Sequence, residues 1–143
     1  MTLVEIAIAA AVLGLVAATA IATLMLLNKN AVSTRVMGNA REIVQRNIEA
    51  AVGAPFTATN IPPILALATN AVWDDDGGGD NQETIYANRD GSGAVLGTLT
   101  RTVASPVPNA AGTNVVQVTF QLNYTLFSRP MSYQMTTIRA MDQ

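Results

Sequence analysis

The N-terminal part of the chain is a long apolar run that passes into an amphipathic pattern. Residues 6–27 carry no charged side chain. As a helix this run is roughly 33 Å long, which is enough to cross a bilayer core. Apolar residues then recur at steps of three and four, so the helix continues with one apolar face, until Pro55. We therefore expect one helix over about residues 2–52, with residues 1–27 as its apolar half and 28–53 as its amphipathic half.

The period of the pattern changes to two in the C-terminal part. In "VQVTFQLNYTL" (residues 116–126) apolar and polar residues alternate, which predicts a half-buried antiparallel strand. "MSYQMTT" repeats the alternation, and "AVLGTLTRTV" and "ETIYAN" are weaker strand candidates. Residues 54–83 are expected to form a connection, with a short helical turn at Pro63. The predicted fold class is α+β: the amphipathic half of the helix packs on a small antiparallel sheet formed by residues 84–143.

Composition excludes several classes of function. The net charge is −2 and no basic cluster is present, which argues against nucleic-acid binding. The chain has no cysteine, so no disulfide supports the fold. It also lacks histidine and a glycine-rich phosphate loop, and no set of residues suggests a catalytic site. We therefore expect a protein that is not an enzyme, with no catalytic residues.

Glu5 is the unusual residue of the apolar run. A carboxylate in apolar surroundings costs about 2.5–3.5 kcal/mol on insertion scales. The next basic side chain, Lys29, lies roughly 36 Å along the same helix, and the α-amino group of Met1 is the only nearer cation. Thr2 and Glu5 also fit a helix capping box, in which each side chain binds the other residue's backbone N–H. Capping explains Glu5 in an isolated helix, but it does not explain the long apolar run behind it.

The N-terminal "TLVEIAIAAAVLGLVAA" resembles the mature N-terminus of type IV pilins and of the related pseudopilins. The resemblance is strong over residues 1–27 and looser over the rest. It implies a ladle-shaped pilin-like fold, and a leader peptide removed before a methylated Met1. It also implies that Glu5 neutralises the terminal amine of a neighbouring subunit while the apolar helices form the core of a filament. Small residues such as Gly14 would let those helices approach closely. The assembly residues implied are Met1, Thr2, Glu5 and Gly14.

The resemblance implies a structural subunit of an extracellular type IV pilus-like filament, used for adhesion or motility. Its partners would be further copies of itself in a helical homopolymer, a prepilin peptidase and methylase, and the inner-membrane assembly machinery. A membrane-anchored pool would precede assembly. Ala22 and Glu42 stand where many members of the family have prolines, which favours the alternative of a type II secretion pseudopilin. A third possibility, from another class, is a signal-anchored surface binding module.

Two charged features of the sequence suggest local interactions. Glu42 and Arg46 have the spacing and order of a favourable helical ion pair. The segment "DDDGGGD" offers Asp74, Asp76 and Asp80 as oxygen ligands for calcium, which takes about six to eight of them. The spacing does not fit an EF-hand loop, and a solvated acidic turn is the simpler interpretation. Calcium is the one cofactor that the sequence suggests.

Overall fold

A computed structural model gives the conformation of most of the chain. It describes residues 2–57, 59–75, 82–87, 93–104 and 115–142. The chain divides into two compact units, residues 1–35 and residues 36–143. Helix α1 (Leu3–Gly53) is a single α-helix of 51 residues, as the sequence predicts.

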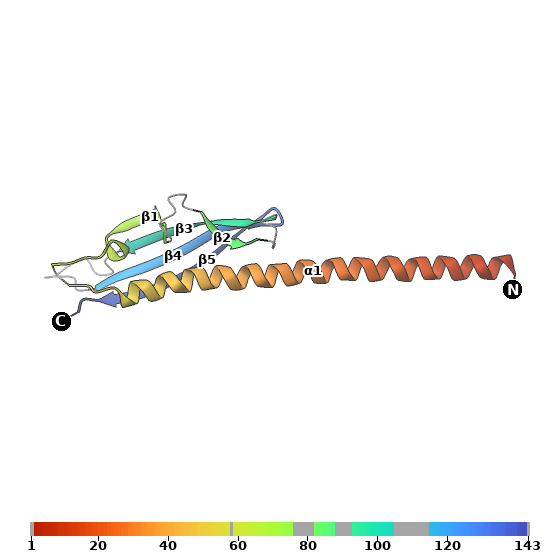
Figure 1. Ribbon diagram of the computed structural model, residues 1–143, viewed down its shortest axis with the longest axis horizontal. Coiled ribbons are helices and arrows are strands. Elements are labelled where there is room, and N and C mark those ends of the chain that lie inside the picture. The colour runs from red at the N-terminus through yellow and green to blue at the C-terminus, as the bar shows by residue number, and fades with distance from the viewer. Residues whose placement is uncertain (1, 58, 76–81, 88–92, 105–114, 143) are drawn as a thin grey trace. The chain divides into compact units, whose positions relative to one another are not determined.

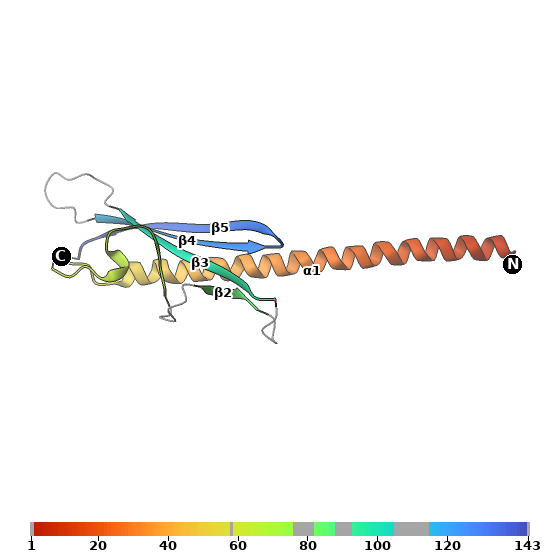
Figure 2. The same cartoon turned by 90° about the horizontal axis from the view of Figure 1, so that it is seen from above.

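The second unit contains an antiparallel sheet of five strands (Figures 1 and 2). A 3-10 helix, η1 (Pro63–Leu65), precedes the strands. The strand order is β1-β3-β4-β5, and β2 pairs with β3 as well. The register of β3 with β4 and of β4 with β5 runs without a bulge. The strands are β1 (Ala68–Val72), β2 (Glu83–Tyr86), β3 (Val95–Ala104), β4 (Val115–Leu126) and β5 (Arg129–Ala140).

The core of this unit lies between the sheet and the second half of α1. Every second residue of β4 is buried, and Phe120 and Leu122 are fully inaccessible. On the helix, Val36, Ala40 and Val44 are also fully inaccessible. The three- and four-residue spacing of the helix meets the two-residue spacing of the strand, so both apolar faces are removed from water. The predicted α+β class is confirmed, with one long helix followed by a small antiparallel sheet.

Two parts of the sequence prediction need correction. The segment 54–83, expected to be a connection, contains strand β1, and β2 already begins at Glu83. Strand β1 has no regular alternation because a bulge interrupts its pairing with β3, and Asn70 within it has a φ of 48°. The helical turn expected at Pro63 is confirmed by η1.

The two ends of the sheet-forming segment are bonded to each other. The Phe56 N–H donates to Asp142 Oδ2 at 2.8 Å, and the Asp142 N–H donates to the Phe56 carbonyl at 2.7 Å. Arg139 donates to Asp142 Oδ1 at 2.6 Å and to the Ala54 carbonyl at 3.3 Å. The hydrogen bond from Phe56 and then the contact with Arg139 lower the pKa of the Asp142 carboxyl. The chain end is thereby fixed beside the end of α1.

Candidate functional site

The start of α1 is a reciprocal capping box. The Thr2 N–H donates to Glu5 Oε2 at 2.8 Å, and the Glu5 N–H lies 3.4 Å from Thr2 Oγ1. Both side chains are exposed. The capping interpretation of Thr2 and Glu5 is therefore confirmed within the chain itself. Met1, whose amine is the other expected partner of Glu5, lies outside the described residues.

The apolar half of α1 has an exposed hydrophobic surface. Leu3, Leu13 and Leu15 are 85%, 71% and 70% exposed. An 18-residue window of the helix has a mean hydropathy of 2.4 and no buried residue, so α1 is long and apolar enough to cross a membrane. Its polar side chains are satisfied within the helix: Thr19 donates to the Val16 carbonyl and Thr23 to the Thr19 carbonyl, each at 2.9 Å. Both threonine hydroxyl groups therefore donate to the helix backbone and can be removed from water without losing this hydrogen bond.

Gly14 lies in the middle of this surface, and no contact within the described part of the chain requires a glycine there. A Cβ placed on Gly14 would meet no atom within 4 Å apart from the helix's own nearby backbone. A glycine in a helix interior costs roughly 0.5–1 kcal/mol relative to alanine. The described structure of one chain offers no close contact that offsets this cost.

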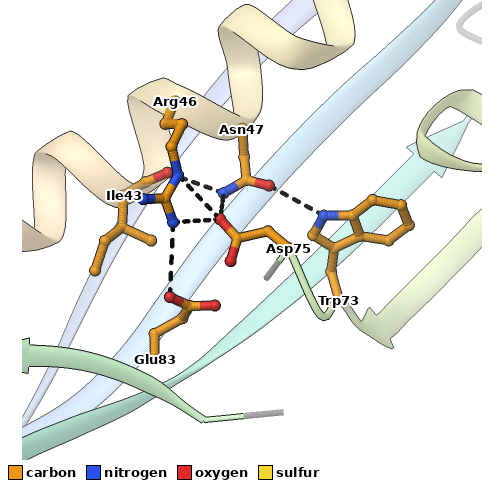
Figure 3. A network of polar contacts seen from close by, with 6 residues as sticks. All are labelled: Ile43, Arg46, Asn47, Trp73, Asp75 and Glu83. Carbon is orange, nitrogen blue, oxygen red and sulfur yellow. Dashed lines mark hydrogen bonds and ion pairs between the residues drawn. The ribbon is translucent and has the colours of Figure 1, made fainter. Parts of the chain in front are cut away.

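The second unit contains a polar network that fastens the segment after β1 to α1 (Figure 3). Asn47, 2% exposed, donates to Asp75 Oδ2 at 2.7 Å and to the Ile43 carbonyl at 3.0 Å. Its Oδ1 accepts a hydrogen bond of 3.0 Å from Trp73 Nε1. Arg46 donates to Asp75 Oδ2 at 2.6 Å through its terminal nitrogen. Two adjacent helix residues thus hold one carboxylate and one indole of the same segment.

The ion pair of Arg46 differs from the sequence prediction. Among the described residues, Arg46 pairs with Asp75 at 2.6 Å and with Glu83 at 3.8 Å rather than with Glu42. Burial alone would raise the pKa of Asp75, but hydrogen bonds with Glu83, Arg46 and Asn47 outweigh it and the pKa is lowered. The hydrogen bond with Asp75 raises the pKa of Arg46 in turn. The Asp75 carboxylate is largely buried, so its charge-assisted hydrogen bonds with Arg46 are strong. An ion pair between Arg46 and the exposed Glu42 would be weak, because water screens it.

A buried arginine supports the same region from the sheet. Arg101 of β3 is 7% exposed, and its guanidinium lies 4.4 Å from the centre of the Trp73 ring. It also donates to the carbonyl of Pro63 in η1. Burial lowers the pKa of Arg101. The Trp73 ring packs edge-on against Phe120 with 6.3 Å between centres. Arg101 and Asn47 were missed from the sequence because nothing in the pattern marks a polar residue as buried.

The acidic segment gives only part of the suggested calcium site. Asp74 and Asp75 are described, whereas Asp76 and Asp80 lie outside the described residues. The neighbouring carboxylate of Asp75 is bound to Arg46 and Asn47. Within the described part of the chain, no three acidic, histidine or cysteine side chains come together as a metal site. The described geometry of Asp75 therefore attaches the segment to the helix.

The chain was compared with protein-family models, with curated proteins and with solved structures. None of the three comparisons finds a match. The functional interpretation therefore depends on the residues and on their geometry, above all on Glu5 and the exposed apolar surface that follows it.

Proposed function

We propose that the chain is a structural subunit of a type IV pilus-like filament with a pilin-like ladle fold. The observation that carries the proposal is the position of Glu5 at the start of an exposed apolar helix. The resemblance of residues 1–27 to mature pilins supports it. The α+β architecture, with one long helix before a small sheet, is compatible with it.

The charge of Glu5 is the physical basis of assembly in this proposal. Thr2 satisfies one carboxylate oxygen, but no described residue forms an ion pair with Glu5. Parallel packing of apolar helices would remove that carboxylate from water, which is costly for an unpaired charge. The terminal amine of Met1 in a neighbouring subunit would relieve the cost. Only a subunit added in the correct axial position would bring the two charges together.

Helix packing in the filament core would use the exposed apolar half of α1. Contacts with other helices would replace the lipid or solvent that covers this surface in a single subunit. Glycine and alanine allow close backbone approach between helices, and Gly14 has free space at its Cβ position. The cost of Gly14 in one chain then has an explanation in the assembled state.

The proposal includes the cellular path of the subunit. The apolar half would hold it in the inner membrane before assembly, where a prepilin peptidase and methylase and the assembly machinery would act on it. The filament would then extend outside the cell and serve adhesion or motility. A type II secretion pseudopilin is the second candidate. The unbroken course of α1 through Ala22 and Glu42, where many pilins have prolines, favours this alternative.

The test is the assembly of Glu5→Gln and Glu5→Val variants in the native cells. Surface material is sheared, imaged and analysed for the mass of the subunit. We expect wild-type filaments of the full chain with a methylated Met1, and loss of filaments in both variants. Glu49→Gln is the matched control, because Glu49 is an exposed helix carboxylate and its loss changes the charge equally. Normal filaments with Glu5→Gln would refute the charge-pairing mechanism.

The same experiment separates the three candidates. If the chain is found only in short assemblies within the cell envelope, and if these assemblies are lost in the Glu5 variants, the pseudopilin is favoured. A chain that stays in the membrane fraction and keeps its surface activity in Glu5→Val cells would favour the anchored binding module.

A further inference from the structure

The sheet has one face without charge. The strands contain four charged residues, Glu83, Arg101, Arg129 and Arg139. The pairing register places each of them level with a β4 residue that points into the core: Arg101 pairs with Phe120, for example. We use the name outer face for the opposite side chains of β3, β4 and β5. Its centre comprises Thr100, Thr102, Thr119, Gln121, Gln134 and Thr136.

The centre of the outer face is a regular array of hydroxyl and amide groups. Thr119 and Thr136 share a hydrogen bond of 2.9 Å between their hydroxyls across β4 and β5. Gln121 Nε2 donates to Ser132 Oγ at 3.0 Å and to Asn123 Oδ1 at 2.9 Å. These contacts, two across the strands and one along β4, hold the side chains in fixed positions. Because neither strand pairing contains a bulge, the array continues over the three strands.

One end of the outer face is hollowed into an open groove of about 560 Å³. Its lining includes polar outer-face side chains, the apolar Leu96 and Pro130, and also Tyr124 and Met131 from the inner side of the sheet. No charged residue lines it in the described structure. Amide and hydroxyl groups over a partly apolar floor can both donate and accept hydrogen bonds. The outer-face residues that line the groove are Leu96, Thr98, Asn123, Thr125, Pro130 and Ser132.

The chemistry of this face excludes several classes of partner. A nucleic acid or an anionic membrane requires lysine and arginine, and the described outer face has neither. The centre of a protein interface is enriched in aromatic residues, whereas the aromatic residues of β4 and β5 lie on the inner side of the sheet, and of these only Tyr124 contributes to the lining of the groove. A neutral partner rich in hydroxyl groups could pair with the donors and acceptors of this face without burying a charge.

We propose that the outer face and its groove bind a neutral polysaccharide in an extended chain. Each hydrogen bond to such a ligand is weak, so binding depends on the repeated array of donors and acceptors. In an assembled filament, many subunits would contribute to binding at once. The face belongs to one subunit and does not require the filament. Failure of the filament proposal therefore leaves this proposal open to its own test.

The test measures adsorption of the full chain, purified in detergent micelles, to microcrystalline cellulose. Phosphocellulose serves as the charged counterpart. We expect binding to cellulose that changes little between low and high salt, because no ion pairs contribute. Thr119→Lys, at the centre of the outer face, should weaken it roughly tenfold or more. The double variant Asn123→Ala/Ser132→Ala removes two polar groups of the groove without adding a charge, and it should also weaken binding to cellulose.

Two control variants make the outcome specific. Val52→Lys adds the same charge on the exposed side of α1, at a residue 48% exposed, and should bind as the wild type does. Glu5→Val, which tests the filament proposal, should also leave cellulose binding unchanged. The proposal is overturned if the wild type does not adsorb to cellulose, or if folded Thr119→Lys adsorbs equally. Self-association in solution that Thr119→Lys abolishes, without cellulose binding, would assign the face to a second copy instead.

Discussion

Thr2 and Glu5 cap each other, with the Thr2 N–H 2.8 Å from Glu5 Oε2 and the Glu5 N–H 3.4 Å from Thr2 Oγ1. Glu5 therefore has a role in the single chain that is distinct from charge pairing between subunits. Thr2 contributes to the cap alone, whereas the charge of the Glu5 carboxylate is required for the proposed pairing between subunits. This difference allows the two roles to be separated by substitution.

The first prediction separates capping from charge. Thr2→Ala removes one capping acceptor and should destabilise the helix start by about 0.5–2 kcal/mol. Glu5→Gln keeps an oxygen acceptor for the Thr2 N–H and removes the charge. We expect reduced helix content by circular dichroism in Thr2→Ala but nearly normal filament yield, and the reverse in Glu5→Gln. Equal loss of filaments in both variants would mean that capping alone accounts for Glu5.

The second prediction concerns Asn47. Asn47→Ala removes the acceptor of the Trp73 indole N–H and one of the donors to Asp75 Oδ2 in a buried region, while Arg46 still donates to that oxygen. We expect a loss of about 2–4 kcal/mol in the free energy of unfolding, measured by urea denaturation of the full chain in micelles. Asn39→Ala is the control, since Asn39 makes one side-chain hydrogen bond within the described part of the chain, a donation of 2.7 Å to the Ile85 carbonyl. Its loss should be about 1 kcal/mol. Equal losses would contradict the network.

The third prediction is a pH dependence from Asp75. Its pKa in the folded protein is lowered from the ordinary aspartate value, because hydrogen bonds with Glu83, Arg46 and Asn47 outweigh the effect of burial. A lowered acid pKa stabilises the fold at pH values above the unfolded pKa, and this contribution is lost as the pH falls through the folded pKa. Stability should therefore fall below about pH 4. Asp75→Asn should be less stable at neutral pH and should show a shallower decrease.

Asp142 also has a lowered pKa and contributes in the same direction. Some acid dependence should therefore remain in Asp75→Asn, and the double variant with Asp142→Asn should flatten the curve further. The measurement is the free energy of unfolding against pH. An unchanged slope in Asp75→Asn would show that the Arg46 contact does not stabilise the carboxylate.

The fourth prediction concerns the turn between β4 and β5. Phe127 and Ser128 have φ values of 49° and 62°, in the left-handed region that favours glycine and asparagine. Ser128→Gly should raise the free energy of unfolding by about 1 kcal/mol, because it removes this backbone strain. Ser132→Gly, in the extended part of β5, should lower it instead. Destabilisation by Ser128→Gly would exclude strain at this position.

The sequence predicted the regular elements well because their periods were clear. The alternation in residues 116–126 became β4 (Val115–Leu126), and the long helix was placed within a residue at each end. Strand β1 was missed because Asn70 and the bulge break its alternation. The turn between β4 and β5 lies at Phe127 and Ser128, and these residue types give no signal for positive φ.

The polar network around Asp75 could not be predicted from the sequence. Arg46 had a suitable partner at Glu42, and local spacing cannot show that Asp75, distant in the chain, competes for it. Nothing in the local pattern of α1 marks Asn47 as buried, although it is 2% exposed. The capping box was predictable because both of its residues lie within one helical turn. Contacts between distant segments depend on the fold, which the pattern determines only coarsely.

The closure between Phe56 and Asp142 has a mechanical consequence for the sheet-forming segment. A force applied between the last residues of α1 and Asp142 enters and leaves this segment at Phe56 and Asp142, which are bonded directly to each other. The hydrogen bonds of Phe56, Asp142 and Arg139 therefore take the tension first. Strands β1 to β5 lie on the loop between these residues, so they are not stretched until this closure opens.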